Sequence, residues 1–222
     1  MQIKLAYGKT GHIIELDDAW NVQVVEPHFT PGLPEPLEAL RAALRAPIGS
    51  PPLASLAHAG QKVGIIVNDL TRPTPNPIML RALFEELAHI PKEDITLFIA
   101  LGTHRPNTPA ELLSMLGEEA LTYRIVQNNA FDITTQVCLG PTQRGHEVWL
   151  NAELAACPVK ILTGFIEPHF FAGFSGGGKA VMPGMAGLRT ILLNHCYEHI
   201  ASPRATWGVT HGNPVWEEVR EV

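Results

Sequence analysis

The residues that could carry chemistry are densest at residues 164–184, which read GFIEPHFFAGFSGGGKAVMPG. This segment places His169, three consecutive glycines and Lys179 within eleven residues. Glycines lack a Cβ atom, so their backbone N–H groups can turn inward and approach an anion closely. Lys179 adds an amine at the same place. The segment therefore predicts a loop that binds an anionic ligand, such as a phosphorylated molecule.

The same segment also matches the beginning of a P-loop, because residues 173–179 satisfy the pattern GxxxxGK. Ala180, however, stands where a P-loop has the Ser or Thr that ligates Mg²⁺. Residues 167–172 also separate the first glycine from the preceding apolar run. These departures disfavour a P-loop phosphotransferase but leave phosphate binding open, with Lys179 as either an electrostatic partner or a covalent attachment point.

A second group of polar side chains follows the apolar run KVGIIV, in the segment NDLTRP. Asp69 can accept a hydrogen bond from a ribose hydroxyl or hold an imidazole, and Thr71 can donate to a phosphate. Arg72 can pair with a carboxylate through two parallel hydrogen bonds. The alternative is an Asx turn with a surface ion pair. Because acid, hydroxyl and guanidinium groups occur together, we favour a functional role.

Two histidines in polar or glycine-rich loops are candidate acids and bases. His104 lies in the segment Gly102–Arg105, just after a predicted strand. We expect it to lie near Arg72, and this position favours a catalytic role over a structural one. His169 stands before two phenylalanines, an apolar setting that should lower its pKa and keep it neutral, as a general base requires. A core histidine bonded to a carbonyl oxygen would explain His169 equally well.

A further histidine pair, His195 and His199, lies within one predicted helix at positions i and i+4, and therefore on a common face. Neutral imidazoles in this spacing suit nickel, copper or zinc. The residue after His195 is Cys196, not the glutamate that follows the first histidine of a zinc protease motif. The spacing by itself favours a structural pair over a metal site.

These groups need a framework, and the chain predicts an α/β fold, with a parallel Rossmann-like sheet flanked by helices. Short β-branched runs alternate with helical patterns, in the order strand 62–67, helix 78–88, strand 94–100, helix 109–116, strand 123–126 and strand 159–166. Parallel strands joined by helices place ligands beyond their carboxyl ends. We therefore expect three loops to converge on one site, at residues 68–72, 102–105 and 167–179.

Elements outside this core are less regular. We expect a small N-terminal β element over residues 1–30, an α/β core over residues 60–210, and a helix over residues 188–199. The remaining predictions are strands at 3–6, 12–16, 22–25, 134–139 and 147–150, and a helix at 34–45. Residues 211–222 predict a loop and the start of an amphipathic helix. We expect either that the chain continues or that this helix packs on something outside it.

Composition limits the classes of function. The chain has 222 residues, 45% of them hydrophobic, and a formal charge of −6, which argues against nucleic acid as the main partner. No apolar run is long enough for a membrane span, and the N-terminus lacks the pattern of a signal peptide, so we expect a cytoplasmic protein. The three cysteines have no metal-site or disulfide spacing, which indicates reduced thiols.

Four sequence blocks in residues 68–214 resemble the nickel-pincer lactate racemase family. They are NDLTRPTP, ALGTHRP, PHFFAGFSGGGKAVMPGMAG, and LLNH followed by HGNPV. The long glycine-lysine block is the specific one. The resemblance covers the N-terminal, cofactor-binding and catalytic domain of that family, over residues 1–222. The family's C-terminal domain, which closes over the site, has no counterpart in these residues, so such a domain or an oligomer partner is expected to pack on the site.

The resemblance implies a cofactor and the residues that hold it. The cofactor is a nickel-pincer nucleotide (nickel pyridinium-3,5-bisthiocarboxylic acid mononucleotide), covalently bound to Lys179. The histidine that matches His195 supplies a nickel ligand. The segment formed by Asp69, Leu70, Thr71 and Arg72 contacts the cofactor. By this resemblance His195, rather than His199, is the metal ligand.

The resemblance also implies a reaction, the racemisation or epimerisation of a small 2-hydroxy acid by reversible hydride transfer. His104 and His169 then stand on either side of the substrate as alternating acid and base, and Arg72 suits the substrate carboxylate. Two bases are useful because a planar 2-keto acid can accept hydride on either face. The alternative is a non-enzymatic module that binds a nucleotide or phosphate, which predicts ligand binding without racemisation.

Overall fold

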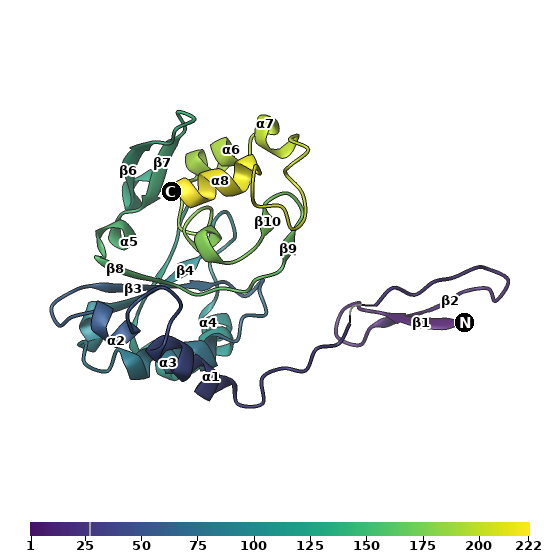
Figure 1. Ribbon diagram of the computed structural model, residues 1–222, viewed down its shortest axis with the longest axis horizontal. Helices are drawn as coiled ribbons and strands as arrows, with labels where there is room; N and C mark the ends of the chain where they lie inside the picture. Colours follow the sequence, from purple (N-terminus) through teal and green to yellow (C-terminus); the bar gives the residue numbers. More distant parts are fainter. Residues whose placement is uncertain (27) are drawn as a thin grey trace. The chain divides into compact units, whose positions relative to one another are not determined.

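The computed structural model describes residues 1–26 and 28–222 and divides into two compact units, Met1–Pro34 and Glu35–Val222 (Figure 1). Residue 27, which falls within the predicted N-terminal β element, lies outside the described residues.

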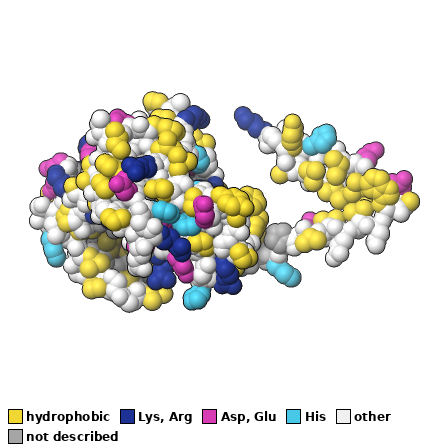
Figure 2. Space-filling model, turned by 90° about the horizontal axis from the view of Figure 1, so that it is seen from above, with side chains coloured by type: hydrophobic (Ala, Val, Ile, Leu, Met, Phe, Trp, Pro, Cys, Tyr) yellow, Lys and Arg dark blue, Asp and Glu magenta, His cyan; other side chains and the backbone are white. Residues whose placement is uncertain are grey.

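The small unit contains one antiparallel hairpin, formed by β1 (Gln2–Leu5) and β2 (His12–Glu15). The predicted third strand at residues 22–25 is wrong, because no described segment pairs with it. None of the described residues of this unit is buried, and apolar side chains such as Tyr7 and Trp20 are exposed (Figure 2). A lone two-stranded hairpin is at best marginally stable in water, so this unit contributes no core of its own.

A four-stranded parallel sheet forms the centre of the larger unit, which confirms the predicted fold class. The strand order is β5 (Arg124–Gln127), β4 (Ile95–Ala100), β3 (Val63–Asn68) and β8 (Val159–Leu162). In the central strand β3, Val63 aligns with Ile95 on one side and with Val159 on the other. β8 is shorter than predicted, because its pairing with β3 ends at Leu162.

Helices cover one face of this sheet (Figure 1). They are α1 (Pro36–Arg45), α2 (Leu53–Leu56), α3 (Asn76–Glu86) and α4 (Pro109–Leu116). Alternate side chains of β3 point to opposite faces of the sheet. Ile65 therefore belongs to the core between the sheet and these helices, whereas Ile66 belongs to a separate core on the opposite face. α4 begins where predicted, because Thr108 and Glu111 form a capping box around its first turn.

The opposite face carries shorter elements. They are the hairpin β6 (Gln136–Pro141) and β7 (Glu147–Asn151), β9 (Pro168–His169), β10 (Gly173–Phe174), and the helices α5 (Ala152–Ala156), α6 (Leu188–Asn194), α7 (Tyr197–Ile200) and α8 (Pro214–Glu221). Single 3₁₀ turns lie at Lys92–Asp94, Glu119–Thr122, Ile133–Thr135 and Gly177–Ala180. Val215 and Val219 of α8 are buried within this unit, so one face of this helix packs on the chain itself.

The predicted single helix over residues 188–199 is wrong. α6 ends at Asn194, and Cys196 adopts an extended conformation with φ −70° and ψ 164° before α7 begins. His195 and His199 therefore do not share a helix face, and the i, i+4 argument for a joint metal site does not apply to them.

The helices within residues 1–26 and 28–222 are all too short or too polar to cross a membrane. The cytoplasmic location stays a prediction.

Candidate functional site

A cavity of about 260 Å³ lies beyond the carboxyl ends of β3 and β4. All three predicted loops contribute to it, which confirms that they converge. The cavity brings together seven of the predicted site residues: Asp69, Thr71, Arg72, His104, His169, Lys179 and His195. Leu70, the remaining one, does not line this cavity and is 44% exposed.

Asp69 holds the imidazole of His104. Its Oδ2 lies 2.7 Å from His104 Nδ1, while its Oδ1 accepts hydrogen bonds from the backbone N–H and the hydroxyl of Thr71. Asp69 is 5% exposed, whereas the His104 side chain is about half exposed. Of the two roles open to Asp69, ribose binding or imidazole binding, the geometry favours the second.

His169 is half-buried against aromatic rings. Its ring centroid lies 4.7 Å from that of Phe171 in an edge-on arrangement. Burial, and then the positive charges of Lys179 and Arg72, lower the pKa of His169 to about 4. The predicted direction of this shift is confirmed, and His169 is neutral at physiological pH.

The two histidines carry their protons on different ring nitrogens. His104 Nδ1 faces a carboxylate and therefore donates, which leaves the Nε2 lone pair free. His169 Nδ1 accepts from the backbone N–H of Ala172 at 3.3 Å, which places the proton of the neutral ring on Nε2. At rest, His104 thus presents a free lone pair at Nε2, whereas neutral His169 presents an N–H at Nε2, which it can give up as a proton only when Nδ1 is protonated as well.

Lys179 places an amine in the cavity without a compensating anion. Among the described residues, its Nζ has no hydrogen-bond or ion-pair partner, and it lies 5.8 Å from the centroid of the Phe171 ring. Burial and the nearby Arg72 guanidinium lower the pKa of Lys179 to about 8. A desolvated amine with a lowered pKa is a better nucleophile at neutral pH than an ordinary lysine.

We expect this pKa to be visible in chemical labelling. Acylation of Lys179 in the folded protein, followed by peptide mass spectrometry, should rise with a midpoint near pH 8, because only the neutral amine reacts. The same peptide in unfolded protein should show a midpoint near the ordinary lysine value of about 10.4. Arg72→Gln should raise the folded midpoint by removing a neighbouring positive charge. Equal midpoints in the folded and unfolded protein would contradict the geometry.

His195 follows the last residue of α6 and also lines the cavity. Its Nδ1 is buried and has no hydrogen-bond partner among the described residues. Burial and the charge of Lys179 lower the pKa of His195 to about 4, so the imidazole is neutral. A neutral imidazole with a free nitrogen can ligate a metal ion. His199 lies outside this cavity.

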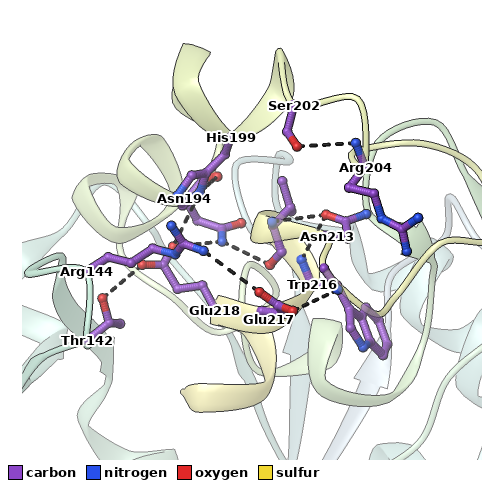
Figure 3. Close-up of polar contacts among 12 residues, drawn as sticks. Thr142, Arg144, Asn194, His199, Ser202, Arg204, Asn213, Trp216, Glu217 and Glu218 are labelled. Carbon is purple, nitrogen blue, oxygen red and sulfur yellow. Dashed lines mark hydrogen bonds and ion pairs between the residues drawn. The ribbon is translucent and has the colours of Figure 1, made fainter.

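Three supporting residues were not predicted. Phe171 lies between His169 and His195, with ring centroids 4.7 Å and 5.2 Å away. Glu167 pairs with Arg72 at 3.4 Å. Asn213, which is fully buried, donates to the Phe171 carbonyl oxygen. Its side-chain oxygen also caps α8 by accepting from the backbone N–H of Trp216 (Figure 3). Asn213 belongs to the block HGNPV, so its position before a helix-starting proline was the available signal.

The glycine-lysine segment forms a tight turn around Lys179. Gly176 has a φ of +74° and lines the cavity, and a 3₁₀ turn follows it. Among the described residues, the N–H groups of Gly177 and Gly178 have no hydrogen-bond acceptor. Free backbone donors next to a lysine are compatible with the predicted binding of an anion, which stays a prediction.

Known proteins resemble this chain in sequence over most of its length. A sequence profile described as the lactate racemase N-terminal domain matches residues 7–208. The chain is 38% identical over 184 residues to a lactate racemase from Lactiplantibacillus plantarum and 35% identical over 184 residues to one from Thermoanaerobacterium thermosaccharolyticum. Each alignment covers 82% of this chain but only 43% of the relative, so the chain spans less than half the length of either one.

A solved structure gives the same result at the level of the fold. The lactate racemase apoprotein from Thermoanaerobacterium thermosaccharolyticum superposes with a TM-score of 0.86 at 32% identity. The match covers 99% of this chain and 52% of that chain.

Proposed function

The chain belongs to the family of lactate racemase N-terminal domains, and from that premise we propose that it forms the cofactor-binding and catalytic half of a 2-hydroxy acid racemase or epimerase. The remaining half of the relatives' length would supply a closing C-terminal domain. The substrate is a small 2-hydroxy acid of the lactate type.

The observation that supports this proposal most strongly is the set of side chains that lines the cavity beyond β3 and β4. It is lined by two histidines with opposite proton positions, a buried amine and a further neutral histidine. An ordinary phosphate-binding loop has no need for this set. A racemase that transfers hydride needs all of it, because it must move one proton on each side of a planar 2-keto acid.

The residues present fit a nickel-pincer nucleotide. Lys179 would hold it through a covalent bond, since its amine is buried and free of partners. His195 would ligate nickel, because its buried Nδ1 has no other partner. When bound, the cofactor supplies a reversible acceptor for the hydride on the substrate Cα. Asp69, Thr71 and Arg72 lie where they can contact it.

The side chains of this chain would perform the proton transfers and the positioning. His104 takes the hydroxyl proton of one enantiomer at Nε2, and Asp69 stabilises the resulting imidazolium. His169 would act for the other enantiomer: as an imidazolium it would donate its Nε2 proton to the 2-keto acid as the hydride returns, and the neutral ring so formed would take the hydroxyl proton back at Nε2 in the reverse direction. Arg72 would bind the substrate carboxylate. The substrate carboxylate would then replace Glu167, which pairs with Arg72 at 3.4 Å.

The decisive experiment measures the nickel and the mass of the Lys179 peptide. Protein purified from a host that makes the cofactor should carry a single nickel ion per chain and show added mass on that peptide. Lys179→Ala should lose both. Lys160→Arg is a matched control, because Lys160 lies in β8 and does not line the cavity. Unmodified Lys179 without nickel would refute the proposal, whereas loaded protein that never racemises with its C-terminal domain would favour the non-enzymatic binding module.

His195→Ala should separate metal binding from cofactor attachment. We expect nickel to be lost after a chelator wash while the added mass on Lys179 remains, because the covalent bond does not involve His195. Metal analysis and peptide mass spectrometry on one sample test both parts. His58→Ala, at an exposed histidine, should retain nickel. Full nickel retention in His195→Ala would show that His195 is not a ligand.

A further inference from the structure

Outside the racemase cavity, two histidines and a glutamate form a second cluster of metal-ligating side chains. His146 comes from the turn between β6 and β7, His199 from α7 and Glu218 from α8. One ligand atom of each lies within 4.8 Å of those of the other two. Figure 3 shows His199 on one side of the Glu218 carboxylate.

Glu218 is a buried carboxylate whose nearest titratable neighbours are two histidines. It is 2% exposed, and its only ion-pair partners among the described residues are His146, at 2.7 Å, and His199, at 3.8 Å. No lysine or arginine of the described chain pairs with it. A buried carboxylate is costly unless it is paired. With both imidazoles neutral, the cluster keeps a net negative charge that a bound cation would neutralise.

The surrounding hydrogen bonds resemble the outer shell of a metal site. Glu218 accepts from Thr142 Oγ1 and Asn194 Nδ2, each at 2.9 Å (Figure 3). His199 Nδ1 lies 2.9 Å from the Asn194 carbonyl oxygen, to which it must donate, and 3.8 Å from Glu218 Oε2, so Nε2 is the ring nitrogen left for a metal ion. Metal-ligating histidines commonly donate their second ring N–H to a carbonyl or carboxylate, because this fixes the tautomer and the ring orientation.

We propose that His146, His199 and Glu218 bind a divalent zinc ion. Two imidazoles and a carboxylate form one of the ligand sets that zinc uses with an open fourth position. A cavity of about 460 Å³ reaches His146 and His199, so water can complete the coordination. This site does not depend on the racemase activity.

Zinc binding requires a small local adjustment. Zinc–ligand distances of about 2.0–2.2 Å bring the ligand atoms closer together than they lie here. His146 is on a hairpin turn and can move toward the other two. Zinc would replace its hydrogen bond to Glu218, and the neutral ring would carry its N–H on the other nitrogen. Arg144, which also lines this cavity, is directed to Glu217 at 3.8 Å.

Zinc titration of the 222-residue chain, made without nickel or cofactor, tests the proposal. We expect the wild-type chain to retain a single zinc ion through gel filtration with a weak chelator, and added zinc to raise its Tm. The double variant His146→Ala/His199→Ala should lose both effects. His195→Ala and His58→Ala should keep both, because neither residue belongs to the cluster.

Two further measurements make the result independent of folding defects. Far-UV circular dichroism shows whether the double variant folds, and His199→Gln offers a milder change that should also lose zinc. Anomalous diffraction at the zinc edge from wild-type crystals should give a peak between His146, His199 and Glu218. No retained zinc, equal retention in the folded double variant, or peaks only at surface histidines would overturn the proposal.

Discussion

If the proposed function is right, replacing His104 or His169 with alanine in the nickel-loaded chain, supplied with a C-terminal domain of the family, should abolish steady-state racemisation in both directions. A positioned acid or base typically contributes roughly 10²–10⁴-fold to a rate, so we expect kcat/KM to fall by at least about 10²-fold. Nickel content should not change, because neither histidine is the proposed metal ligand. Racemisation assays and metal analysis on the same preparations test this.

Both directions must fall together even though each histidine serves a different enantiomer. The equilibrium constant between two enantiomers is one, so the two values of kcat/KM stay equal in every variant. The separate roles should appear in a single turnover, where each variant still forms 2-keto acid from one enantiomer only, and the favoured enantiomer differs between the two variants. His58→Ala should behave as wild type. Full activity of His104→Ala in both directions would refute the two-base scheme.

The charge of Lys179 links the proposed covalent attachment of the cofactor to the basicity of His169. After burial, the charge of Lys179 is the largest cause of the low pKa of His169. Acylation of the amine removes that charge, so the pKa of His169 should rise toward the range where it can accept a proton. A charged Lys179 thus keeps His169 a weak base, and covalent attachment through this amine would bring His169 nearer to the pKa that general base catalysis requires.

Much of the framework could be predicted because local sequence and tertiary packing agree. The strands of the sheet are apolar enough to be buried, and Thr108 with Glu111 marks the start of α4. Since parallel strands end at one edge, the loops after β3, β4 and β8 had to meet there. His104 and His169 belong to two of these loops, so their position at one cavity could be predicted from the sequence.

The failures come from features that periodicity does not encode. The break between α6 and α7 depends on one extended residue, Cys196, inside an otherwise helical pattern. The second cluster joins three elements that are distant along the chain, so His146 carried no motif and Glu218 belonged to a short terminal helix. Likewise, the convergence of the loops after β3 and β8 could be predicted, but not which of their side chains pair, as Arg72 does with Glu167.

Asp69→Asn should be nearly as damaging as the loss of His104 itself. In the wild-type chain, the Asp69 carboxylate accepts the Nδ1 proton of His104 and leaves the Nε2 lone pair toward the cavity. An asparagine amide can instead donate to Nδ1, which moves the imidazole proton to Nε2 and removes the base. Loss of an orienting carboxylate of this kind costs roughly 10⁴-fold in serine proteases, so we expect a fall in kcat of about 10²–10⁴-fold.

The chain offers a matched control for the turn that Asp69 forms. Asp132 makes the same local contacts, accepting from the backbone N–H of Thr134 at 3.0 Å and from its hydroxyl at 2.6 Å, but it holds no histidine. Asp132→Asn should therefore leave kcat unchanged. If Asp69 acts by positioning His104, the pH profile of kcat in Asp69→Asn should also shift, whereas a merely weakened turn would lower activity without moving the profile. Wild-type kcat and an unchanged pH profile in Asp69→Asn would show that His104 does not depend on this carboxylate.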